Sequence, residues 1–388
     1  MAAARDTVST IGVSRSSQVR GGCSSPDSDT MNTKIWHVVK RLLAGLVGLV
    51  VMLAVSGYAV REYRLHEIAK AVQTPNGIDA AEFVKIGGID QWLTIRGQNR
   101  DNPVLLFLHG GPGFSFLSLN PRAFLDWERD FTLVQWDQRG AGKTYGKSGA
   151  LDPAVTIDRI ASDGVEVAEL VRAKLHKERI ILVGLSWGSI IGIDMVKVRP
   201  DLFYAYVGTG QVASYLQGRR LAYTQLMAEA RTKGDRQALE ELEGVGPPPY
   251  DSSSKEGVHA RWATAYEPGM PSVWSNISTV LFNSAITFGD LSHLINGMGE
   301  SEDHFRSQLN AVDLAAADTD FAIPMFVFQG SMDNVNPVPP VAAYIDRMTA
   351  PQKKLIVIPG AGHNVMLTRS ADFLRLLREW VRPLAIHA

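Results

Sequence analysis

Cysteine is almost absent from this sequence, and so are the patterns that bind metal ions. The single cysteine among the 388 residues is Cys23, so no intramolecular disulfide can form. The sequence contains no H-E-x-x-H segment and no cysteine pair, from which zinc ligands commonly come. We therefore expect chemistry that uses no metal ion.

An excess of charge of either sign is also lacking. The 39 Lys and Arg residues nearly balance the 40 Asp and Glu residues, and the formal net charge is −1. Nucleic-acid-binding surfaces concentrate positive charge, so we expect no nucleic acid as a partner. No G-x-G-x-x-G segment follows the first predicted buried strand, which argues against a dinucleotide, and no cofactor is predicted.

A long segment without charge lies near the N-terminus. Residues 42–60 contain no charged side chain, and about 20 apolar residues span the core of a bilayer. Lys34, Lys40 and Arg41 precede the segment, which favours an N-terminus on the cytoplasmic side. The sequence predicts a single-pass membrane anchor over residues 34–64, with the larger part of the chain on the extracytoplasmic (periplasmic) side.

Two alternatives are open for this segment. Ala54 and Ser56 are small residues of the kind found at signal-peptide cleavage sites, so the segment could be removed after export. A buried core helix is the other alternative. Residues 1–33 are rich in Ser, Gly, Asp and Arg and show no periodicity, which predicts a disordered extension or one that is not native. The sequence leaves open whether translation starts at Met1 or at Met31.

Short apolar strands alternate with amphipathic helices from about residue 80 onward. Continuous apolar runs are typical of buried parallel strands, and residues 157–175 repeat apolar side chains at helical spacing. This alternation predicts an α/β fold, a mostly parallel sheet covered by helices on both faces. The predicted strands are a pair within residues 83–95, then 104–108, 132–136, 180–183, 204–207, 325–328 and 354–358, and a helix over 371–381 closes the chain.

Residues 212–320 interrupt this alternation and have a mostly helical pattern, with a Gly-Pro-Pro-Pro break at 246–249. Because the strand pattern resumes afterwards, we expect a helical cap inserted over the carboxyl edge of the sheet, where open α/β sheets place their sites. The predicted organisation is an extension (1–33), an anchor (34–64), a first core part (80–211), the cap (212–320) and a second core part (321–388).

Ser186 is the central candidate for chemistry. It lies in Gly184-Leu185-Ser186-Trp187-Gly188, a G-x-S-x-G segment between a predicted strand and a helical stretch. A sharp strand-to-helix turn of this kind lifts the serine hydroxyl above the sheet, and its glycines avoid clashes where the backbone bends. The pattern predicts that Ser186 is a nucleophile.

A serine nucleophile needs a base, and the base needs a group that orients it. His363 follows the predicted strand 354–358, and Asp333 follows the strand 325–328. The carboxyl ends of parallel strands meet at one edge, so these side chains can converge on Ser186. Asp318 and Asp320 are weaker candidates for the acid, because they precede the strand 325–328.

His109-Gly110-Gly111-Pro112-Gly113 follows the predicted strand 104–108. A glycine-rich turn at this point exposes backbone N–H groups that can stabilise a developing oxyanion. The expected donors are the amides of Gly111 and Trp187.

These motifs together resemble the proline iminopeptidase (prolyl aminopeptidase) family of α/β-hydrolases. The resemblance rests on HGGPG at 109–113, WDQRGAGKT at 136–144 and GLSWGS at 184–189, and it covers roughly residues 80–388. It implies the α/β-hydrolase fold, a Ser-Asp-His triad, a two-amide oxyanion hole and release of an N-terminal residue, often proline. Asp137 and Arg139, in the second motif, are interpreted as structural.

In that family a carboxylate in the cap receives the free amine of the substrate, within a pattern similar to A-x-x-W-x-x-W-E. Residues 260–267 resemble it, with Tyr266 in place of the second Trp and the first Trp one position early. The resemblance therefore assigns amine binding to Glu267, and a carboxylate is a suitable partner for an ammonium group.

Two departures from the family pattern bear on specificity and on the loop after strand 132–136. The second cap acid of the family, in an E-N-H-Y-F-like stretch, has no counterpart in residues 281–285, and Glu302-Asp303-His304-Phe305 is only a partial echo. Thr144 stands where Ser is commoner. The first departure weakens the case for strict proline specificity.

Three functional hypotheses follow. The leading one is a serine aminopeptidase that releases an N-terminal residue, with proline preferred, from peptides through an acyl-enzyme intermediate. The second is a membrane-anchored carboxylesterase or related acyl hydrolase that uses the same triad on a small amide or ester. The third is a binding module that kept the fold without catalysis.

Overall fold

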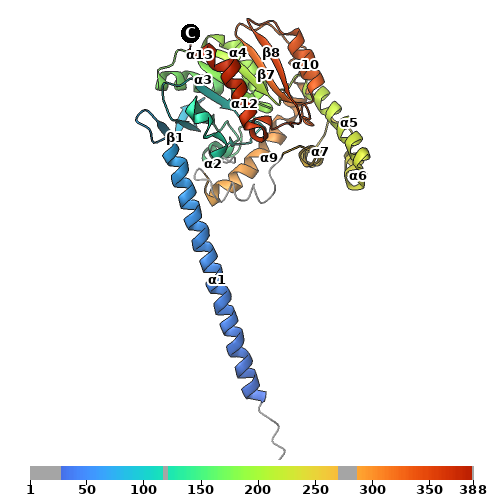
Figure 1. The fold of residues 1–388 in the computed structure, drawn as a ribbon. Coiled ribbons are helices and arrows are strands. Elements are labelled where there is room, and N and C mark those ends of the chain that lie inside the picture. The colour runs from blue at the N-terminus through green and yellow to red at the C-terminus, as the bar shows by residue number, and fades with distance from the viewer. Residues whose placement is uncertain (1–27, 117–120, 270–285, 387–388) are drawn as a thin grey trace, which may run out of the picture. The chain divides into compact units, whose positions relative to one another are not determined.

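The computed structural model of the chain describes residues 28–116, 121–269 and 286–386 (Figure 1). Residues 1–27 of the predicted extension, and residues 281–285 of the cap, lie outside the described residues. The predicted boundary at residue 33 differs from the structure, because helix α1 already begins at Ser28.

Helix α1, Ser28–Ala71, contains the uncharged run of the sequence. Within it, Thr33–Ala71 is long and apolar enough to cross a membrane, with a mean hydropathy of 2.2. None of that apolar window is buried, so it is not a core helix of the described chain. Length and composition are those of a membrane span or of a signal sequence.

A compact unit begins at Arg61 and contains an eight-stranded sheet in the described residues. The strand order is β1-β2-β4-β3-β5-β6-β7-β8. β1 pairs with β2 and β2 with β4 in antiparallel orientation, and the remaining six strands, β3 to β8, are parallel to one another. The bounds are β1 Ile78–Ile86, β2 Ile89–Gly97, β3 Val104–Leu108, β4 Thr132–Trp136, β5 Ile180–Leu185, β6 Phe203–Thr209, β7 Met325–Gly330 and β8 Lys353–Ile358.

The predicted mostly parallel sheet is confirmed. β3 and β4 have the predicted bounds, and the other strands extend the predicted ones by one to five residues at an end. Helix α3, Ile157–Leu175, also has the predicted bounds; Thr156 caps its first turn by accepting a hydrogen bond from the Arg159 N–H group.

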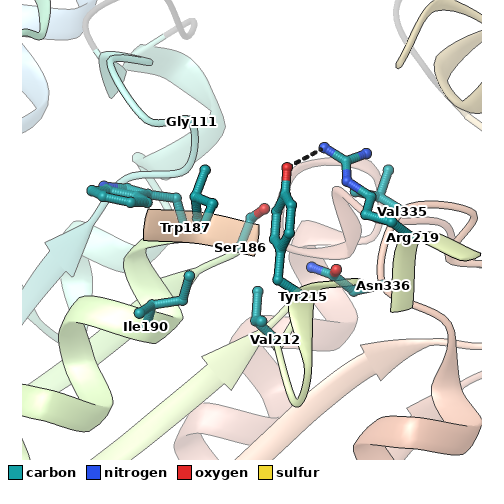
Figure 2. A pocket seen from close by; sticks show the side chains of 10 residues that line it. Gly111, Ser186, Trp187, Ile190, Val212, Tyr215, Arg219, Val335 and Asn336 are labelled. Carbon is teal, nitrogen blue, oxygen red and sulfur yellow. Dashed lines mark hydrogen bonds between the residues drawn. The ribbon is translucent and has the colours of Figure 1, made fainter. Parts of the chain in front are cut away.

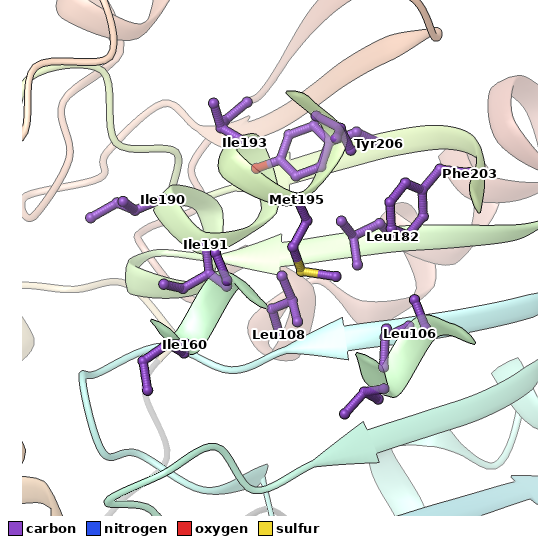
Figure 3. Packing of buried hydrophobic residues seen from close by; sticks show 14 of the residues in the cluster. Leu106, Leu108, Ile160, Leu182, Ile190, Ile191, Ile193, Met195, Phe203 and Tyr206 are labelled. Carbon is purple, nitrogen blue, oxygen red and sulfur yellow. The ribbon is translucent and has the colours of Figure 1, made fainter. Parts of the chain in front are cut away.

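Helices cover both faces of the sheet. Side chains alternate along β3: Leu106 and Leu108 pack into one hydrophobic cluster, and Leu105 and Phe107 into another. Figure 3 shows the first cluster, in which strand side chains meet isoleucines of α4. The helices are α2 Gly142–Ser148, α3 Ile157–Leu175, α4 Trp187–Val198, α10 Val338–Arg347, α11 Val365–Thr368, α12 Ser370–Leu376 and α13 Arg382–Ile386, with a π-helical turn at Leu377–Val381 and 3₁₀ turns at Pro121–Phe124, Trp127–Arg129 and Pro200–Leu202.

The chain between β6 and β7 is helical in its described residues, as expected for a cap. The helices are α5 Tyr215–Lys233, α6 Arg236–Val245, α7 Ser253–Ala265 and α9 Phe288–Ala311. The predicted Gly-Pro-Pro-Pro break separates α6 from α7. The two ends of the cap are joined by an antiparallel bridge between Ser214 and Asp313. The α/β-hydrolase architecture with a helical insertion thus has the predicted form.

Candidate active site

Ser186 lies in a strained turn between β5 and α4. Its φ of 53° and ψ of −116° are rarely adopted by residues other than glycine, and such a conformation costs about 1–3 kcal/mol. The turn is held because the Ser186 N–H group donates to the Thr209 carbonyl at 2.9 Å. A Cβ atom added at Gly188 would lie 2.2 Å from the Leu108 carbonyl oxygen, so the turn presses against β3 where only glycine fits.

His363 and Asp333 form a buried pair at the same sheet edge. The Nδ1 atom of His363 lies 3.0 Å from each carboxylate oxygen of Asp333. Asp333 also accepts hydrogen bonds from the N–H groups of Val335 (2.9 Å) and Asn336 (2.8 Å) and from the side-chain amide of Gln329 (2.7 Å). A carboxylate only accepts, so Nδ1 carries the proton and Nε2 is left to take one from a nucleophile.

The charge of Asp333 sets the basicity of the imidazole. Burial alone lowers the pKa of His363, but the charge and hydrogen bonds of Asp333, helped by the charge of Glu267, outweigh burial and raise it. Asp318 and Asp320, the weaker candidates, lie elsewhere: Asp318 pairs with Lys197 at 2.9 Å. The structure therefore brings only Asp333 of these three acids to the imidazole.

Ser186 and His363 both lie close to the Thr209–Gly210 segment. The Ser186 N–H group donates a hydrogen bond to the carbonyl of Thr209, the residue before Gly210. A Cβ atom added at Gly210 would lie 2.6 Å from the His363 ring. The described residues show no hydrogen bond between the serine hydroxyl and the imidazole. Such bonds are often long before substrate binds and tighten in the complex.

Gly111 and Trp187, the residues whose amides the sequence predicts as oxyanion donors, lie beside Ser186. Both line one pocket with Ser186 (Figure 2). Trp187 is the first residue of α4, where an N–H group has no acceptor within the helix. Gly111 has a φ of 123°, which favours glycine.

A chain of hydrogen bonds links the Gly110–Gly111 peptide to the indole of Trp187. His109 Nδ1 lies 2.8 Å from the Gly110 carbonyl, and the Gln138 N–H group donates to His109 Nε2 at 3.1 Å. The Trp187 indole N–H donates to the Gln138 side-chain oxygen at 2.8 Å. Burial lowers the pKa of His109 to about 4, so its ring is neutral and serves both bonds.

Asp137 and Arg139 hold the adjoining loop. Asp137 is buried and accepts from the Ser115 hydroxyl at 2.5 Å and from the Lys143 N–H group at 2.8 Å. Burial, opposed by these hydrogen bonds, raises its pKa to about 7. Arg139 pairs with the buried Asp163. These contacts are those of structural residues, as we interpreted them from the sequence.

Glu267 lies behind the imidazole and not among the residues that line the pocket. One of its carboxylate oxygens accepts from the Asn364 N–H group at 2.6 Å, and the other from the Asn364 side-chain amide at 3.2 Å. Burial raises its pKa. Its predicted role in amine binding stays a prediction, and the described contacts tie it to the loop that carries His363.

Several residues of the site were not predicted as site residues from the sequence, although Gln138 lies within the motif at 136–144. Gln138, Gln329 and Asn336 act through contacts between distant segments, and Tyr215 and Arg219 line the pocket from the cap. In the described part of the chain no group of three or more His, Cys, Asp or Glu residues could hold a metal ion.

The chain is similar to known proteins over most of its length. A family model described as "Alpha/beta hydrolase family" matches residues 105–376. A "Probable aminopeptidase YbaC" of Bacillus subtilis (strain 168) is 26% identical over 303 residues, covering 77% of this chain and 95% of that protein. A proline iminopeptidase of Lactobacillus delbrueckii subsp. bulgaricus is 24% identical over 307 residues, covering 77% and 97%.

A solved structure gives the same comparison in three dimensions. The proline iminopeptidase of Mycobacterium smegmatis superposes with a TM-score of 0.57 at 19% identity, over 79% of this chain and 99% of that one. At this identity the likeness is one of fold.

Proposed function

The chain belongs to the alpha/beta hydrolase family, and we propose that it is a serine aminopeptidase that releases an N-terminal residue, with proline preferred, from short peptides. The family, together with relatives named proline iminopeptidase and aminopeptidase, makes it a serine hydrolase similar to prolyl aminopeptidases. The buried His363–Asp333 pair beside the strained Ser186 turn supports the serine-hydrolase chemistry. The observation that carries the choice of an N-terminal residue is the similarity to relatives named aminopeptidase and proline iminopeptidase.

In the proposed reaction the Ser186 hydroxyl oxygen attacks the first peptide carbonyl, and its proton passes to Nε2 of His363. The carbonyl oxygen takes up the negative charge and accepts hydrogen bonds from the Gly111 and Trp187 amides. The peptide C–N bond then breaks, and the imidazolium returns the proton to the leaving amine. Water, deprotonated by His363, hydrolyses the acyl-serine ester and releases the N-terminal residue.

A carboxylesterase is the second candidate. It is favoured by the contacts of Glu267, whose carboxylate bonds to Asn364 and does not line the described pocket. Without a free cap acid, none of the described residues that line the pocket would favour a substrate with an N-terminal ammonium group.

A substrate panel separates the two candidates. Wild type, Ser186→Ala and Glu267→Gln are tested on prolyl, alanyl and leucyl arylamides, on N-acetylprolyl arylamide and on aryl esters. The aminopeptidase proposal expects hydrolysis of free-amine arylamides, much less of the acetylated one, and loss of activity in Ser186→Ala. Equal rates on free and acetylated substrates would contradict it. Ester hydrolysis untouched by Glu267→Gln, with no aminopeptidase activity, would establish the esterase.

We also propose that α1 anchors the enzyme in a membrane, with the catalytic unit on the extracytoplasmic side. The apolar run supports a span, and the basic residues before it support this orientation. Carbonate extraction of membranes tests the anchor: an anchored chain stays in the pellet, whereas a cleaved or peripheral one is released. Protease added to intact spheroplasts tests the orientation.

A further inference from the structure

The pocket beside Ser186 carries a cation that the proposed reaction does not use. The residues lining the pocket are otherwise uncharged in the described part of the chain, and Arg219 is the charged one (Figure 2). It comes from α5, the first helix of the cap, one turn after Tyr215, which lines the same pocket. A substrate held at Ser186 therefore meets a guanidinium group on the cap side.

The guanidinium of Arg219 is held by neighbouring side chains, but one of its N–H donors has no acceptor among the described residues. One terminal nitrogen donates to the Tyr215 hydroxyl at 3.3 Å and lies 2.6 Å from a carboxylate oxygen of Glu256, on α7. Its Nε–H group is buried and has no hydrogen-bond partner among the described residues. A buried N–H group without an acceptor is energetically unfavourable, so the guanidinium still has a donor to offer to an acceptor.

Arg219 keeps its charge in this setting. Only 14% of its side chain is exposed. Burial lowers its pKa, but Tyr215 and Glu256 outweigh burial and raise it. The acids of this cluster, Glu256 and Glu302, are not among the pocket-lining residues, and burial followed by repulsion from Glu256 raises the pKa of Glu302. Of this charged cluster, Arg219 is the member that lines the described pocket, and Glu256 contacts the hydroxyl of Tyr215 at 3.5 Å.

This arrangement opposes an ammonium group in the pocket and favours an anion. A guanidinium group binds a carboxylate better than it binds any neutral acceptor, because its N–H groups match the two oxygens. Glu267, for which the sequence predicts amine binding, lies on another side of the site, next to the loop of His363. A substrate with both charges would have one partner at each position.

We propose that Arg219 binds a carboxylate of the substrate and makes the enzyme selective for substrates that bring a negative charge into this pocket. The carboxylate has two possible sources, the C-terminus of a dipeptide and the side chain of an acidic N-terminal residue. The inference rests on the proposed function for the choice of peptides, and on the pocket alone for the charge preference.

Three matched substrate pairs test it on the full chain in detergent. Prolyl-leucine against prolyl-leucine amide reports on the C-terminal carboxylate. Glutamyl arylamide against glutaminyl arylamide reports on the side chain. An aryl hemisuccinate against an aryl butyrate asks the same question of an ester, so the charge preference is measured even if no peptide is cleaved and the proposed function fails.

The wild type is expected to prefer the charged member of at least one pair by roughly tenfold to a hundredfold in kcat/KM, the range expected from a charge-assisted hydrogen bond. Arg219→Gln should bring that ratio close to one, mainly through KM, and Arg219→Lys should keep part of it. Arg220→Gln is the matched control: this exposed neighbour on α5 bonds to the Pro248 carbonyl and should leave the ratio unchanged.

Arg219→Gln leaves Glu256 buried without its cation, so the variant could fold poorly. The double variant Arg219→Gln/Glu256→Gln removes both charges and keeps the comparison usable. Ratios near one in the wild type for all three pairs, or a preference that survives in the double variant, would overturn the proposal.

Discussion

Asp333→Asn is the substitution that probes the proposed triad most directly. Four donors converge on this carboxylate: the N–H groups of Val335 and Asn336, the Gln329 amide and His363 Nδ1. Asparagine offers one acceptor oxygen and an NH₂ group, so the NH₂ group must face a donor. If its oxygen takes the backbone pair, His363 is driven to the tautomer with the proton on Nε2, which cannot accept the serine proton.

The expected loss is large. The same exchange in a Ser-His-Asp protease lowers kcat about 10⁴-fold, equivalent to about 5 kcal/mol of transition-state stabilisation. The pH profile should move as well. In the wild type the imidazole must be neutral to act as base, so activity falls as pH drops through the raised pKa of His363. Loss of the Asp333 charge lowers that pKa, so the acid limb should shift to lower pH.

The assay is kcat/KM on a prolyl arylamide from about pH 5 to pH 9, a range that spans the titration of histidine. Asp318→Asn is the matched control, because this exposed acid pairs with Lys197 and should leave the profile unchanged. A folded Asp333→Asn enzyme with more than about a tenth of wild-type activity and an unshifted profile would refute the assignment of Asp333 as the orienting acid.

Three further predictions concern the groups around the nucleophile. Gln138→Leu leaves the Trp187 indole N–H without its acceptor. We expect the free energy of unfolding, measured by urea titration, to fall by about 1–3 kcal/mol, and kcat to fall at similar KM. An unchanged kcat would contradict the link between the proposed oxyanion donors. Gly188→Ala places a methyl group 2.2 Å from the Leu108 carbonyl oxygen and should yield little folded protein, measured as the soluble monodisperse fraction; normal yield would show that the turn can relax. Burial lowers the pKa of His109 to about 4 from an ordinary 6.5, so between pH 6.5 and pH 4 the unfolded chain binds a proton that the folded chain does not. The free energy of unfolding should therefore fall by up to about 3 kcal/mol over that window. Denaturant titrations in which His109→Gln keeps the same acid sensitivity would assign the loss to other groups.

Local sequence patterns determined much of the fold. The apolar runs of β3 and β4 and the helical periodicity of α3 gave the observed bounds, because each pattern is contained in one element. The ends of β5 and β7 extend past the predicted ones, because Gly184-Leu185 and Gln329-Gly330 interrupt the apolar runs but still pair with the neighbouring strands. Helix α1 begins at Ser28, earlier than the composition of the extension suggests.

The convergence of the proposed site residues could be predicted for those that follow strand ends, but not for those whose position depends on tertiary packing. Ser186, His363 and Asp333 each follow a strand of a parallel sheet, so topology alone brings them to one edge. The pairing of Arg219 with Glu256 joins two cap helices whose relative placement no periodicity encodes. The contacts of Glu267 with Asn364 are likewise tertiary, and its motif gave no hint of them.

The bridge between Ser214 and Asp313 has a consequence for how this scaffold can be diversified. The chain leaves the sheet and returns to it at neighbouring points: the Tyr215 N–H group donates to the Val312 carbonyl at 3.0 Å, and the Ala315 N–H group donates to the Ala213 carbonyl at 3.0 Å. A different insertion could be grafted between these two points without altering the spacing of β6 and β7. The pocket-lining residues that this segment supplies, Tyr215, Arg219 and Leu309, can then be exchanged without changing the residues at the sheet edge, so a swap of the segment from Ser214 to Asp313 with a relative should alter the pocket and leave the edge intact.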